Sequence, residues 1–142
     1  MERHEFLTKL GVGALGLCMG SCLAACSKSN NAGPSTNNPP AGTTFTVDLA
    51  TSLTNVGESR VSNGIIVARV ATGNVASSFT AVQVACTHEG TAINYNNGQG
   101  NFVCPLHGSV FSKTGAVIQG PATSALKQYA VAVAGTTLTV TV

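Results

Sequence analysis

The stretch VACTHEGTAINYNNGQGNFVCPLHGS, residues 84–109, contains two short motifs that each pair a thiol with an imidazole. The first motif is Cys86-Thr87-His88 and the second is Cys104-Pro105-Leu106-His107. The chain has five Cys and three His in 142 residues, and all the others lie at or before Cys26. A folded domain that follows this N-terminal stretch therefore has these four residues as its complete set of Cys and His.

A predicted β-hairpin brings the two motifs together. Asn97-Gly98 is a strong signal for a two-residue turn, and residues 93–96 are expected to pair with residues 99–102. One motif comes directly before this hairpin and the other directly after it. Each motif then offers one thiolate and one imidazole at the same point in space.

Two thiolates and two imidazoles suit either zinc or an iron-sulfur cluster. Zinc fingers usually group Cys with Cys and His with His, whereas each motif here contributes a Cys and then a His. Two simpler interpretations stay open. Cys86 and Cys104 could form a disulfide in an exported protein, which leaves both histidines without a role, and the four residues could hold a structural zinc ion.

The pattern C-x-H followed by C-x-x-H resembles that of the Rieske family. The resemblance implies one [2Fe-2S] cluster per chain, with Cys86 and Cys104 on one iron and His88 and His107 on the other. It also implies an all-β fold, a Rieske-like antiparallel β-sandwich with a small cluster-binding subdomain of loops and a short hairpin. The resemblance covers residues 45–142, and its further matching residues are Gly90, Gly108-Ser109, Phe111, Gly120-Pro121-Ala122 (the family's proline-containing third loop), Leu126, Lys127 and Tyr129.

The resemblance also assigns residues around the cluster. In high-potential members a Ser and a Tyr donate hydrogen bonds to sulfur; Ser109 matches the Ser, but Phe111 stands where the Tyr would be. Those members also have an extra Cys in each loop, which form a disulfide, and here Thr91 and Leu106 occupy these positions. We therefore expect no loop disulfide and an intermediate or low potential within the family range of about −150 to +300 mV. The residues expected to shape the loops are Pro105, Gly108 and Pro121.

Hydrophobic residues alternate with a period near two through the rest of residues 45–142, which indicates strands. A helical turn is expected only at Thr123–Lys127. The predicted strands are Phe45–Leu49, Ile65–Val70, Phe79–Ala85, Tyr129–Ala134 and Thr137–Val142, with Gly135-Thr136 as the tight turn between the last two.

The N-terminal segment is predicted to direct export instead of joining the fold. Residues 1–25 are expected to be a lipoprotein-type signal peptide, because Leu23-Ala24-Ala25 resembles a lipobox directly before Cys26, the predicted lipidation site. Residues 26–44, rich in Ser, Asn, Pro and Gly, are expected to form a flexible tether. An uncleaved membrane anchor and a soluble product stay open. So does twin-arginine export, whose second Arg is replaced here by His4.

Charged residues make up 8% of the chain, with a net charge of +2 and no basic cluster, so we expect no nucleic-acid partner. The favoured function is electron transfer by a membrane-tethered carrier or a small subunit of an exported oxidoreductase. It would face the periplasm of a bacterial cell envelope, with a cytochrome or a larger oxidoreductase subunit as redox partner. The alternatives are the iron-sulfur subunit of a quinol-oxidising cytochrome bc-type complex and, less favoured, a zinc-stabilised binding module.

No catalytic residue is predicted. The chain cannot be a complete oxygenase by itself, because no His remains for the second, mononuclear iron site that such enzymes need. Glu89, which lies between the two motifs' histidines, is expected to be an exposed residue without a specific role.

Overall fold

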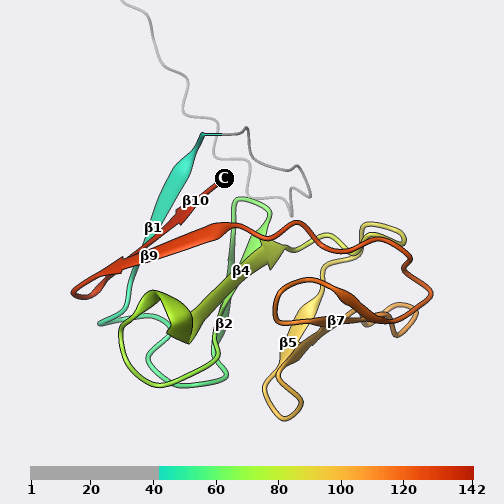
Figure 1. Ribbon diagram of the computed structural model, residues 1–142, viewed down its shortest axis with the longest axis horizontal. Coiled ribbons are helices and arrows are strands. Elements are labelled where there is room, and N and C mark those ends of the chain that lie inside the picture. Colours follow the sequence, from blue (N-terminus) through green and yellow to red (C-terminus); the bar gives the residue numbers. More distant parts are fainter. Residues whose placement is uncertain (1–41) are drawn as a thin grey trace, which may run out of the picture. The chain divides into compact units, whose positions relative to one another are not determined.

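The computed structural model describes residues 42–142, and three antiparallel sheets make up this part of the chain (Figure 1). The all-β prediction is therefore confirmed. The predicted signal peptide, the lipidation site and most of the predicted tether lie outside the described residues. Within residues 42–142 no helix is long and apolar enough to cross a bilayer. The elements are β1 (Thr44–Asp48), β2 (Ser59–Ser62), β3 (Ile65–Arg69), the short 3-10 helix η1 (Ala76–Ser78), β4 (Phe79–Gln83), β5 (Asn94–Asn96), β6 (Asn101–Val103), β7 (Val110–Ser112), β8 (Val117–Gln119), β9 (Ala130–Ala134) and β10 (Thr137–Thr141).

The first sheet has the strand order β1-β10-β9 and is built around the predicted C-terminal hairpin. Gly135 and Thr136 form the two-residue turn between β9 and β10. Leu138 and Val140 share one face of β10 and are fully buried, whereas Thr137, Thr139 and Thr141, on the other face, are not. The period-two pattern of this strand thus gave the correct buried face.

The second sheet, β2-β3-β4, has a hydrophobic core on each of its two faces. All five residues of β3 are buried, which explains why its sequence is an apolar run instead of an alternating pattern. Ile65 belongs to the core shared with β1 and β10, whereas Ile66 belongs to the core that contains Cys86 and Cys104. One face of the second sheet therefore packs into the core that contains the two cysteines.

The third sheet, β5-β6-β7-β8, contains the predicted hairpin, but with a longer turn than predicted. Asn96 pairs with Asn101, so the turn has four residues, Asn97–Gly100, instead of two. Gly100 has a φ of 63°, in the left-handed region that glycine adopts without steric cost, and this makes the longer turn possible. The two motifs still lie on either side of the hairpin, as expected.

Four other segments differ from the prediction. β2 has only one apolar residue, Val61, and becomes a strand by pairing with β3 across the Asn63-Gly64 turn. β7 and β8 have three residues each, which is too short for an alternating pattern to be recognised. The helical turn predicted at Thr123–Lys127 is wrong. This segment is irregular because its bonds go to distant segments; the Leu126 N–H, for example, donates to Gly115 O.

Candidate metal centre

The two motifs form loops with the same backbone hydrogen bonds. In each loop the Cys N–H donates over 2.8 Å to the carbonyl five residues later, that of Thr91 in the first loop and of Ser109 in the second. In each loop the Cys carbonyl accepts from the glycine four residues later, over 2.8 Å from Gly90 and 3.0 Å from Gly108. These glycines have φ values of 77° and 76°, which residues with a Cβ rarely adopt. The sequence thus builds two equivalent turns at the end of the hairpin.

The two thiols lie inside the domain. Cys86 and Cys104 are each 3% exposed, and both are free cysteines, so the disulfide considered from the sequence is not present. Burial has the largest effect on the pKa of the Cys86 thiol and raises it; the backbone of His88 lowers it, and the neighbouring Cys104 thiol raises it again. A buried thiol with a raised pKa, such as that of Cys86, loses its proton readily only when a cation compensates the charge.

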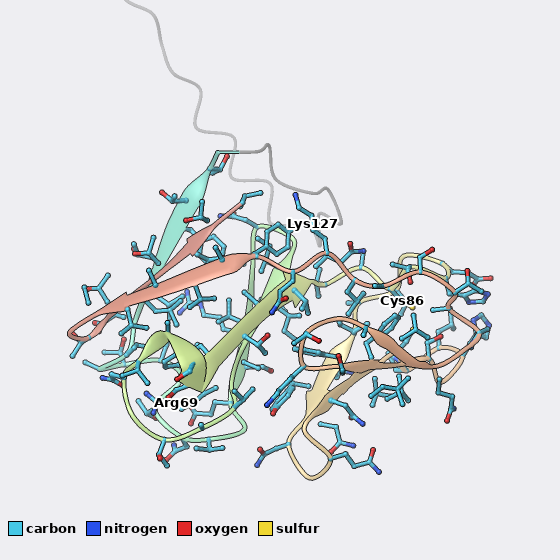
Figure 2. The ribbon with its side chains drawn as sticks, in the orientation of Figure 1. Arg69, Cys86 and Lys127 are labelled. Carbon is cyan, nitrogen blue, oxygen red and sulfur yellow. The ribbon has the colours of Figure 1, made fainter. Side chains whose placement is uncertain are left out.

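Figure 2 shows Cys86 at the end of the domain opposite to Arg69.

The two imidazoles lie at the exposed end of the loops. The Nδ1 atoms of His88 and His107 are 3.2 Å apart, and their rings meet edge to face with centroids 5.0 Å apart. Two nitrogen ligands of one tetrahedral metal ion, each at about 2.0–2.1 Å, are about 3.3 Å from each other. The spacing of the two Nδ1 atoms therefore suits one metal ion shared by both rings.

A third loop, residues 120–125, is hydrogen-bonded to both of the others. Thr87 Oγ1 in the first loop donates to Ser124 O over 2.6 Å. The Ala122 N–H donates over 3.0 Å to Ser109 Oγ, directly after the second loop. Gln119 Nε2 also donates to Gly108 O over 3.2 Å. The third loop therefore connects the first two loops without a covalent bond.

The residues predicted to surround the cluster lie within these loops or beside them. Ser109 and Phe111 are fully buried. Because the Ser109 oxygen accepts its bond from the third loop, its O–H remains available as a donor. Pro105 and Pro121 are exposed, one in the second loop and one in the third, and Gly108 closes the second loop as described.

Two residues of the first loop have contacts that the sequence did not indicate. Thr87 binds a carbonyl 37 positions later in the chain. Glu89 Oε2 lies 3.7 Å from His107 Nδ1, and the ligand atoms of His88, Glu89 and His107 all lie within 4.8 Å of one another. No local pattern could have revealed either contact, because each partner belongs to a different loop.

Comparison with known protein families identifies the domain. The family model of the Rieske [2Fe-2S] domain matches residues 44–130. The chain belongs to the Rieske [2Fe-2S] domain family. It therefore carries a Rieske-type [2Fe-2S] cluster and transfers electrons through it. This confirms the predicted cofactor and the predicted general function, while the four ligands stay a prediction.

The Rieske chain is similar in sequence to iron-sulfur proteins of other organisms. It is 37% identical over 62 residues to the cytochrome b6-f complex iron-sulfur subunit of Chlorobaculum thiosulfatiphilum, a match that covers 44% of this chain and 34% of the relative. It is 38% identical to the plasma membrane Rieske protein of the cyanobacterium Synechocystis PCC 6803, over 55% of this chain and 76% of that one, with a TM-score of 0.48. The matched part thus spans about a third of the length of the curated relative.

A solved structure shares the fold of the Rieske chain. The ferredoxin of carbazole 1,9a-dioxygenase from Nocardioides aromaticivorans IC177 superposes with a TM-score of 0.53 at 23% identity, covering 72% of this chain and 98% of that one. At this low identity the likeness concerns the fold alone. It confirms the Rieske-like architecture predicted from the sequence.

The side chains at the loops fit a Rieske cluster. The cluster needs two sulfur donors for one iron and two imidazole donors for the other. The buried pair Cys86 and Cys104 and the exposed pair His88 and His107 offer these donors, with one Cys and one His on each of the two loops. A single metal ion held by the two histidines and Glu89 would leave both buried thiols without a role, so we favour the cluster arrangement.

Proposed function

We propose that Cys86, His88, Cys104 and His107 bind the cluster and that the domain is a membrane-tethered electron carrier or a small subunit of an exported oxidoreductase. The observation that carries this proposal is the donor arrangement, with two buried free thiols together and two Nδ1 atoms 3.2 Å apart. When bound, the cluster supplies reversible one-electron transfer. The exposed rings of His88 and His107 give a redox partner the most direct access to it.

Hydrogen bonding around the site supports a potential in the intermediate or lower part of the family range. We expect the free O–H of Ser109 to donate to a cluster sulfur. Phe111 has no hydroxyl with which to add a second bond, so the added negative charge of the reduced state is less stabilised. Because Thr91 and Leu106 stand at the two disulfide positions, no disulfide joins the two loops. The hydrogen bonds of the third loop hold them together instead.

The N-terminal segment supports a place at the membrane. Residues 1–25 serve as the lipoprotein signal, Cys26 carries the lipid, and residues 26–44 form a tether with a reach of roughly 20–25 Å by random-coil scaling. Several acyl chains anchor a protein stably where one chain is marginal. The domain, residues 45–142, is then held on the extracytoplasmic side of a bacterial membrane. Replacing Cys26 by Ser should release the protein into the soluble envelope fraction, and continued membrane retention would contradict the lipid anchor.

The iron-sulfur subunit of a quinol-oxidising complex is the second candidate. The name of the curated relative, a cytochrome b6-f complex subunit, favours it. The residues at the two disulfide positions, Thr91 and Leu106, and the missing hydroxyl at Phe111 oppose it. Oxidation of a quinol needs a strongly oxidising cluster, so the measured potential decides between the two candidates.

EPR spectroscopy of the dithionite-reduced protein, followed by a potentiometric titration, tests the proposal. We expect a strongly anisotropic signal with a low average g value, typical of a cluster with His ligands, and an intermediate or low potential. A potential at the top of the family range would favour the quinol-oxidising candidate. A zinc site gives no EPR signal. Replacing His107 by Cys should lower the potential or abolish cluster binding, and an unchanged potential would exclude His107 as a ligand.

A further inference from the structure

The two loops that carry the predicted ligands contain a single charged side chain, that of Glu89. Between Arg69 and Lys127 the only Asp, Glu, Lys or Arg residues are Glu89 and Lys113. Lys113 directly follows β7 at the end of this strand away from the second loop, where its carbonyl accepts a hydrogen bond from Thr80 Oγ1 of β4. Glu89 is therefore the only charged side chain within the two ligand loops, residues 86–91 and 104–109.

The carboxylate of Glu89 is exposed and adjoins the predicted route of electron transfer. Its Oε2 atom lies 3.7 Å from His107 Nδ1, and the side chains of Glu89 and His107 are 54% and 42% exposed. Apart from the two histidines, the other exposed side chains of the two ligand loops are apolar. Leu106, directly before His107, is 53% exposed, and Pro105 is exposed as well. We call this surface, formed by His88, Glu89, Pro105, Leu106 and His107, the tip.

We propose that the tip selects a redox protein that presents a Lys or Arg side chain to Glu89 within an otherwise apolar contact. The inference rests on the proposed function, in which electrons pass through the exposed histidines. The negative charge of Glu89 is poorly screened once water is excluded from an apolar contact, so it favours a cation opposite to it and disfavours an anion. It also accelerates the encounter with a positively charged partner at low salt.

Two small oxidants of opposite charge test this selectivity on the holoprotein. Tris(phenanthroline)cobalt(III) is a trivalent cation and hexacyanoferrate(III) a trivalent anion. Each takes one electron from the reduced protein and becomes cobalt(II) or iron(II), and no bond forms or breaks. At about 10 mM ionic strength, Glu89→Gln should slow the reaction with the cation about fivefold and accelerate the reaction with the anion by a similar factor. Both effects should vanish at about 1 M ionic strength, where the Debye length is about 3 Å.

Opposite changes distinguish a docking charge from a change in potential. A shift of the potential alone would move both rates in the same direction, and that result would overturn the proposal, as would two unchanged rates. The control is Asp48→Asn, which removes the same charge from the end of β1, in a sheet that the ligand loops do not belong to. If this control reproduced the effect of Glu89→Gln, net charge and not the tip would be responsible.

A protein probe extends the test to the proposed class of partner. A cytochrome c with a lysine-rich surface around its haem edge should oxidise the wild-type protein faster at low salt than at high salt. Glu89→Gln should flatten this dependence severalfold more than Asp48→Asn does, and equal flattening would contradict docking at Glu89. A wild-type protein that reduces none of the three oxidants would instead refute the proposed electron-carrier function, and the docking proposal with it.

Discussion

At the scale of single residues, Ser109 joins two loops and is also proposed to donate a hydrogen bond to the cluster. Its buried oxygen accepts the hydrogen bond of Ala122 N over 3.0 Å, which fixes the third loop to the second. The same hydroxyl keeps its hydrogen free for a further acceptor. A Cys or an Ala at this position would lose one of the two functions or both, so the requirement for Ser follows from geometry as well as from family resemblance.

The residue next but one, Phe111, gives a prediction for the reduction potential. Phe111→Tyr adds a hydroxyl in the fully buried core that also contains Cys86 and Cys104. If this hydroxyl donates to a cluster sulfur, it stabilises the reduced state, and the potential measured by EPR-monitored titration should rise.

The control for this substitution is Phe102→Tyr, at the directly opposite position on β6. There the same hydroxyl has no assigned acceptor, and we expect a loss of stability of about 1–3 kcal/mol for an unsatisfied buried group without a higher potential. A potential that is unchanged in Phe111→Tyr, or raised equally in both variants, would show that position 111 does not face the cluster sulfurs.

At the scale of elements, the three loops depend on one another, and Thr87 tests this dependence. Thr87→Val keeps the shape of the side chain but removes the hydroxyl that donates to Ser124 O. Because water can replace an exposed bond, we expect a loss of only about 0.5–1.5 kcal/mol in the free energy of unfolding. The loosened third loop should release the cluster severalfold faster, which is measured as bleaching of the visible absorption in mild denaturant.

Two matched variants make the role of Thr87 specific. Thr87→Ser retains the donor and should keep the wild-type rate of bleaching. Thr123→Val introduces the same change at an exposed position of the third loop and should also leave the rate unchanged. Equal bleaching in all three variants would mean that the third loop is held by its other contacts.

The strands that could be predicted are those whose own residues show which faces are buried, either as alternating apolar and polar residues or as a continuous apolar run. β3 and β10 are examples, since their buried faces follow directly from the sequence. β2 could not be predicted, because its strand character depends on the neighbour that it pairs with. The site shows the same division. The two Cys and the two His could be predicted as ligands from their types and spacing, whereas the contacts of Thr87 and Glu89 depend on how separate loops meet.

At the scale of the whole described domain, the second sheet joins two cores with different tasks. One core contains Leu138 and Val140 of the terminal hairpin, and the other contains both cysteines. The first and second sheets are also joined edge to edge, because Tyr129 N donates to Ala81 O and Gln83 N to Lys127 O. The segment that follows the third loop is thus bonded to β4 and continues directly into β9. The third loop is therefore connected to both the first and the second sheet.

The neighbouring residues Ile65 and Ile66 of β3 test whether the two cores act differently. They are 0% and 2% exposed and face opposite sides of the sheet. Replacing either by Ala should lower the free energy of unfolding by about 2–5 kcal/mol, because each change leaves a cavity in a packed core. Only Ile66→Ala opens the core that holds Cys86 and Cys104. We therefore expect Ile66→Ala to change the EPR line shape and to speed cluster loss under native conditions, and Ile65→Ala to leave both as in the wild type. If the two variants disturbed the cluster equally, the cores would be one cooperative unit, and the sheet between them would not isolate the metal centre from changes on its other face.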